Sequence, residues 1–168
     1  MSGSKYVLGE DRHEVRKACS IYGVFIKELI KGVKKIMDKK MSGPQMTAYQ
    51  TMLLIFSELV KKGKTVLRQD SLIQILYDNF VNTTDENVKL LFEDIAFNKN
   101  LDSITSVDIE DSLSKLQTYG AIGRLNPAYE KIVIYISPEE AETFIKSFDN
   151  KFVKAAEEVA RCFNNGRA

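Results

Sequence analysis

The fold of this chain is decided by residues 103–137, SITSVDIEDSLSKLQTYGAIGRLNPAYEKIVIYIS. The β-prone pair Ile104-Thr105 leads into this stretch, and Thr105 stands three residues before Asp108, the spacing of a capping box that starts a helix. The apolar residues that follow recur at i, i+4 and i+7, which predicts a helix with one buried face: Ile109, Leu113 and Leu116.

Two β-prone runs follow this helix. Gly120 stands where a helix often ends in a left-handed residue. The β-prone runs are residues 121–125 and 131–136, and the turn-rich residues 126–130 (NPAYE) between them predict a hairpin. The predicted order is therefore strand, helix, strand, short turn, strand.

The composition is that of a globular chain. It has 168 residues, 44% of them hydrophobic and 28% charged, enough for one core or two small coupled ones. No apolar run has membrane-spanning length, and residues 1–5 lack the apolar core of a signal peptide, so we expect a cytoplasmic protein without a membrane partner. Cys19 and Cys162 lie in helical apolar patterns, which predicts buried thiols; a bridge between them stays open.

The net charge of +1 hides an asymmetry along the chain. Residues 27–68 carry ten Lys and Arg against three acids, whereas residues 69–120 carry ten acids against three lysines. This pattern fits a basic face for an anionic partner, or two halves that neutralise each other within a fold or across a dimer.

Long helices are predicted at both ends. After residues 1–11, which we expect to be flexible, residues 12–40 form one helix whose apolar seam is wider than one flank of a small domain needs, which predicts packing between subunits. Residues 137–140 (SPEE) carry the signals of a helix start, and residues 138–164 continue at helical spacing as one helix or two. We expect this C-terminal part to pack on the N-terminal helix.

Between these ends, residues 45–137 form the predicted core. Further helices are predicted over residues 47–62, 70–80 and around 88–95, with a short strand at 65–67 and Gly63 closing the first helix.

No pattern points to an enzyme or to a metal site. His13 is the single histidine and has no nucleophile paired with it in sequence, and the glycine-rich phosphate loops and CxxC spacings are absent. The loop from Asn98 resembles the start of an EF-hand, but Ser103 and Ile109 stand where glycine and glutamate are needed. We therefore expect neither cofactor nor calcium or zinc.

The order of elements over residues 103–137 resembles the winged helix-turn-helix fold. With long helices on both sides, the layout is similar to the dimeric MarR-type (multiple-antibiotic-resistance) regulators. This resemblance implies a mainly α fold with a small β-hairpin wing, a homodimer formed by the terminal helices, and a winged core that binds double-stranded DNA.

Two functions follow from this interpretation. The first is a dimeric DNA-binding protein, a transcriptional or genome-maintenance factor. The second is a winged helix used for protein–protein interaction, as a subunit or adaptor whose acidic helix meets a basic partner. They differ in whether the basic residues share a face with the wing. The residues expected to contact DNA are Lys61, Lys62, Lys64, Arg68, Ser112, Ser114, Lys115, Thr118, Arg124 and Lys131.

Overall fold

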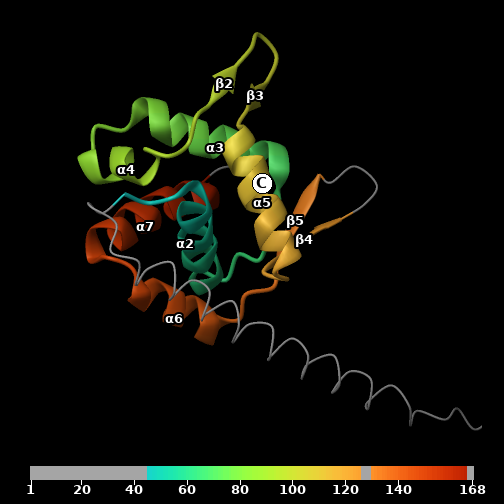
Figure 1. The fold of residues 1–168 in the computed structure, drawn as a ribbon, viewed down its shortest axis with the longest axis vertical. Coiled ribbons are helices and arrows are strands. Elements are labelled where there is room, and N and C mark those ends of the chain that lie inside the picture. Colours follow the sequence, from blue (N-terminus) through green and yellow to red (C-terminus); the bar gives the residue numbers. More distant parts are fainter. Residues whose placement is uncertain (1–44, 126–129, 166–168) are drawn as a thin grey trace, which may run out of the picture. The chain divides into compact units, whose positions relative to one another are not determined.

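The computed structural model describes residues 45–125 and 130–165, all within the second of the two units of the chain, Met41–Ala168. The predicted helix 12–40 and Cys19 lie outside the described residues. The described part is mainly helical with a small antiparallel sheet, which confirms the coarser part of the prediction, a mainly α fold with a small β-hairpin (Figure 1). Its elements are α2 Ala48–Lys61, β1 Val66–Arg68, α3 Gln69–Asn82, α4 Glu86–Leu91, β2 Asn98–Lys99, β3 Ile104–Thr105, α5 Val107–Thr118, β4 Ile122–Leu125, β5 Lys131–Ile134, α6 Pro138–Ser147 and α7 Asn150–Asn165.

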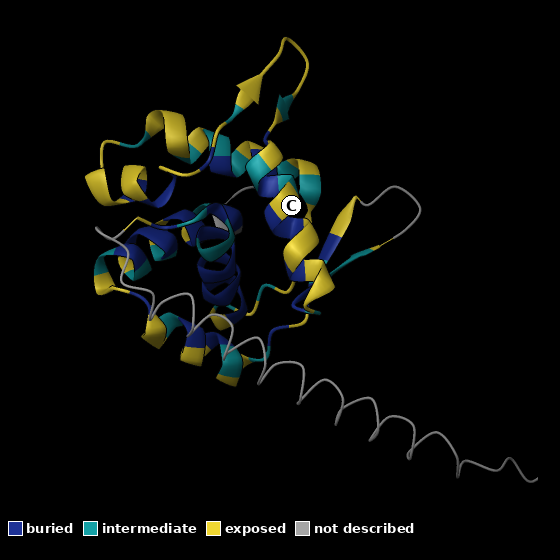
Figure 2. Cartoon of the chain, in the orientation of Figure 1, coloured by how far each residue is buried: buried dark blue, intermediate teal, exposed yellow. Residues whose placement is uncertain are grey.

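Helix α2 is the centre of the core. It begins at a capping box, in which Gln50 N–H donates to Thr47 Oγ1 at 3.2 Å and Thr47 N–H donates to Gln50 Oε1 at 3.0 Å. All residues from 51 to 60 are buried, since α5, α6 and α7 pack around it (Figures 1 and 2). The helix ends at Lys61, and Gly63, directly after the C-cap residue Lys62, has a φ of 77° that favours glycine.

The three-stranded sheet has the order β1-β5-β4, with antiparallel pairing throughout. Strand β5 is central because β1, more than sixty residues earlier, pairs with it through Arg68↔Lys131. One face of the sheet is apolar and buried against the helices, and it consists of Leu67, Ile122, Ile132 and Ile134.

A segment between α3 and α5 was only partly predicted. The helix expected around 88–95 ends at Leu91, and a two-stranded hairpin, β2–β3, follows it. This hairpin extends away from the helices and is largely exposed (Figure 2). The sequence indicated the β-prone pair at 104–105 but not its partner strand.

The predicted signals for helix starts and ends are confirmed at Ser137 and Gly120 but not at Thr105. Ser137 and Glu140 form the predicted capping box, and the C-terminal part divides into two helices, α6 and α7. Gly120 has the expected positive φ, 73°. The box predicted at Thr105 is wrong, because Ser106 is the N-cap of α5 and its Oγ accepts from Ile109 N–H at 3.3 Å.

Candidate interaction surface

Helix α5 presents one face to the core and one to solvent. Its apolar stripe is fully buried, and α5 packs against α2. The opposite face exposes the residues placed there by the sequence pattern: Asp111, Ser114, Lys115 and Thr118. Ser112 is different, because it is buried and its hydroxyl donates to Asp108 O at 2.6 Å. Its selection as a DNA contact is therefore wrong, since a surface partner does not reach it.

Arg124 on β4 is folded against α5. Its Nε donates to Gln117 Oε1 at 2.8 Å, and its terminal nitrogens donate to Glu110 Oε2 at 3.1 Å and Ser114 Oγ at 3.2 Å. The side chain is only 16% exposed. The sequence held a signal for this position, since alternation in a strand places Arg124 on the same face as the buried Ile122. Arg124 joins the sheet to α5, in addition to any role toward a partner.

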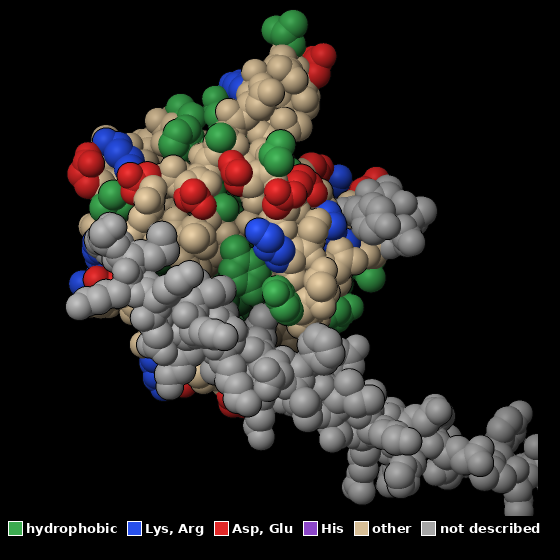
Figure 3. Space-filling view, viewed as in Figure 1, with side chains coloured by type: hydrophobic (Ala, Val, Ile, Leu, Met, Phe, Trp, Pro, Cys, Tyr) green, Lys and Arg blue, Asp and Glu red, His purple; other side chains and the backbone are tan. Residues whose placement is uncertain are grey.

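The N-terminal end of α5 is acidic and partly exposed, and two of its acids are engaged by neighbouring segments. Asp108 Oδ2 accepts from Ala96 N–H at 2.8 Å, so the loop after α4 lies beside this end. Glu110 accepts from Gln69 Nε2 at 2.6 Å, in addition to its contact with Arg124. Asp111 is exposed, as is Glu93. Figure 3 shows acidic side chains gathered across this face.

The lysines of residues 61–64 lie away from the end of strands β4 and β5 that carries Arg124 and Lys131. Thr65 O accepts from Ile134 N–H, at the end of β5 opposite to its junction with the hairpin connection 126–129. Lys62 Nζ lies 3.7 Å from Glu157 Oε1 of α7, and Lys64 Nζ donates to Phe163 O. These lysines therefore face α7, and the structure does not bring them together with Arg124 or Lys131.

Arg68 and Lys131 do come together. They are register partners, so their side chains share the outer face of the sheet. Arg68 is paired with Asp70 at 2.9 Å, and this hydrogen bond holds the pKa of Asp70 below its usual range. Arg68 and Lys131 thus form a small, partly neutralised basic group on the outer face of the sheet.

A buried carboxylate in α2 was missed by the sequence analysis. Glu58 has no exposed surface, and within residues 45–125 and 130–165 no group donates a hydrogen bond to either carboxylate oxygen. Lys61 is an ion-pair partner of Glu58, with Nζ 3.8 Å from Oε2. Burial raises the pKa of Glu58, which Lys61 and Lys62 partly oppose. The signal was available, because residues 52–60 (MLLIFSELV) are apolar on nearly every side.

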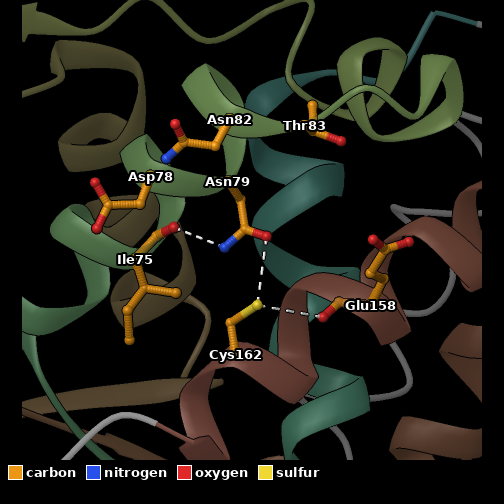
Figure 4. A pocket seen from close by; sticks show the side chains of 7 residues that line it. All are labelled: Ile75, Asp78, Asn79, Asn82, Thr83, Glu158 and Cys162. Carbon is orange, nitrogen blue, oxygen red and sulfur yellow. Dashed lines mark hydrogen bonds between the residues drawn. The ribbon is translucent and has the colours of Figure 1, made fainter.

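A cavity of about 420 Å³ lies between the second half of α3 and α7 (Figure 4). The Cys162 thiol in its wall donates to Asn79 Oδ1 at 3.5 Å, and Asn79 Nδ2 donates to Ile75 O at 2.8 Å. Cys162 is a free thiol. The described residues include no histidine to act as its base, and they hold no cluster of three potential metal ligands. We therefore assign no chemistry to this cavity.

Comparison with protein-family models, with curated proteins and with solved structures finds no match for this chain. No helix in the described part of the chain is long and apolar enough to cross a membrane.

Proposed function

We propose that this chain is a winged-helix protein-interaction module, which binds a basic partner through an acidic face on and beside α5. The topology supports the winged-helix core: α2, β1, α3, α5, β4 and β5 follow one another in the order helix, strand, helix, helix, hairpin, with β5 between β1 and β4. Segment 83–106 is an insertion into this order.

The main support for the proposal is the negative charge at the N-terminal end of α5. In helix-turn-helix proteins this end of the recognition helix contacts base edges in the major groove. Here it carries Asp108, Glu110 and Asp111, and hairpin β2–β3 ends immediately before its cap. Acidic side chains repel DNA phosphates, which supply much of the affinity in protein–DNA complexes. The same charges favour a partner rich in lysine or arginine.

A second candidate is the DNA-binding function, and Arg68 and Lys131 favour it. Their shared outer face lies beside the hairpin connection, where a wing contacts the DNA backbone, and Lys115 is exposed on α5. These three cations would then supply phosphate contacts, and each contact would steepen the salt dependence of binding.

Fluorescence anisotropy with two probes distinguishes these functions. The probes are a random-sequence DNA duplex and a labelled peptide of alternating lysine and serine. We expect salt-sensitive binding of the peptide but not of the duplex. Asp111→Lys should weaken peptide binding, whereas the control Glu142→Lys, at an exposed position of α6, should leave it unchanged. Salt-sensitive duplex binding that Arg68→Ala with Lys131→Ala reduces would replace the proposal by the DNA function.

A further inference from the structure

The outer face of the three-stranded sheet is exposed, and strand pairing holds its residues together. It contains two rows of register partners, Val66–Val133–Gly123 and Arg68–Lys131–Leu125. The side chains of register partners lie on the same face of a sheet, so the two rows belong to one surface. Val66 and Leu125 are 50% and 47% exposed, and both cations are exposed. These rows lie opposite the apolar face that packs on the helices.

Tyr135, directly after β5, lies across Gly123 on this same face. Its N–H donates to Ala121 O at 2.9 Å, so the pairing of β5 with β4 continues to this residue. A Cβ at Gly123 would lie 2.6 Å from the Tyr135 hydroxyl oxygen and 2.8 Å from its Cε2, so the ring occupies the space that a larger residue would fill. The side chain is nevertheless 55% exposed. We call the two rows together with Tyr135 the outer sheet face.

The outer sheet face carries positive charge as well as an aromatic ring. Lys131 stands four residues before Tyr135, roughly 13 Å away at the rise of a strand. In the described part of the chain, Lys131 has no ion-pair partner. Arg68 is paired with Asp70 at 2.9 Å, but both side chains are more than half exposed. Such a pair contributes little free energy, so Arg68 can exchange it for an anionic ligand.

We propose that the outer sheet face binds single-stranded nucleic acid, with a base stacked on Tyr135 and phosphates at Lys131 and Arg68. Aromatic rings on an exposed sheet stack unpaired bases, and cations on the same surface contact the backbone. The distance from Lys131 to Tyr135 corresponds to about four nucleotides at the rise of a stacked strand, about 3.4 Å. A duplex keeps its bases stacked on one another, so it cannot use the ring. This function goes beyond the proposed one, because it uses the sheet and not the acidic face on α5.

Fluorescence anisotropy of the full chain with labelled oligothymidine and oligouridine tests this inference, and the two probes distinguish DNA from RNA. We expect salt-sensitive binding of at least one probe, tighter than that of a random-sequence duplex. Tyr135→Leu should weaken this binding at least about fivefold, whereas Tyr135→Phe should bind as the wild type does, because stacking needs a ring. Lys131→Ala should reduce the magnitude of the salt slope by about 0.7. The matched control is Tyr119→Leu, since Tyr119 is 45% exposed but lies at the end of α5.

Absence of binding to both oligonucleotides would overturn the inference, and so would equal or tighter binding of the duplex. Unchanged binding by Tyr135→Leu would also overturn it, because a surface that accepts leucine equally well is typical of protein docking. Lys131→Ala changes an exposed side chain and should keep the wild-type melting temperature, so an unchanged salt slope in this variant would refute the phosphate contacts independently of Tyr135. Binding of the lysine and serine peptide at α5 should be the same in the wild type and in Tyr135→Leu. Failure of either function therefore leaves the other standing.

Discussion

Replacement of Arg124 by methionine should destabilise the fold, whereas the same change at Lys131 should not. Both are cations on paired strands, β4 and β5, but Arg124 is largely buried against α5 and Lys131 is exposed. Methionine retains an apolar stem of similar length, so the change removes mainly the polar contacts. Lys131→Met therefore controls for the loss of one positive charge from this hairpin.

The size of the effect follows from the partners of Arg124. Each hydrogen bond contributes about 0.5–1.5 kcal/mol net. Gln117 and Ser114 are exposed and regain water when the guanidinium is lost, and the pair with Glu110 is partly solvated, so the lower end of the range applies. We expect a loss of about 1–2 kcal/mol for Arg124→Met. For a domain of this size, that loss of free energy lowers the melting temperature by about 3–8 °C. Lys131→Met should change stability by less than about 0.5 kcal/mol.

Urea unfolding followed by circular dichroism measures both variants. A double-mutant cycle with Glu110→Gln should show a coupling to Arg124 of about 0.5–1 kcal/mol, because the two side chains are in contact. Equal stabilities of Arg124→Met and Lys131→Met would refute the role of Arg124 in joining sheet and helix. So would additive effects of the Arg124 and Glu110 changes.

Three further predictions concern α2, the turn after it, and the helix that the sequence predicts over residues 12–40. Because burial raises the pKa of Glu58, its neutral form is preferred in the folded state, and the contribution of Glu58 to stability is lost as the pH rises through that pKa. Melting temperatures of Glu58→Gln should therefore exceed those of the wild type by a margin that grows from acidic to alkaline pH; a constant margin would contradict this. Gly63→Ala should cost about 1 kcal/mol by chemical denaturation, from its positive φ alone, because a Cβ there meets no atom within 4 Å. If residues 12–40 form the predicted dimer seam, Leu29→Glu should convert the predicted dimer into a monomer in sedimentation, since it places a charge in that seam; a monomeric wild type would refute this prediction.

Local signals in the sequence were sufficient to predict most of the helices and strands. The helix start at Ser137 was predictable because both capping partners lie within four residues. The error at Thr105 has a distant cause: Asp108, its expected partner, accepts from Ala96 N–H instead, and Ser106 takes the capping position. Thr105 and Ser106 are both competent caps, so the choice between them depends on the loop after α4.

The candidate surface was harder to predict than the fold. Lys62 and Lys64 looked available for DNA because their partners, Glu157 and the carbonyl of Phe163, lie about a hundred residues later on α7. Hairpin β2–β3 was missed because each strand has only two residues, too short for a periodic pattern. Its base packs on aromatic rings contributed by separate segments, which no local pattern encodes.

The position of segment 83–106 also bears on the free energy of folding. Pairing of Arg68 with Lys131 closes a loop of about 60 residues, and this segment supplies about 24 of them. The closure entropy of a loop grows only with the logarithm of its length, so the segment adds only about 0.4 kcal/mol to the closure of the sheet. Residues can therefore be added, removed or exchanged within segment 83–106 with little effect on the free energy of pairing β1 with β5. Different hairpins could be grafted between α3 and α5 without changing the pairing of the sheet.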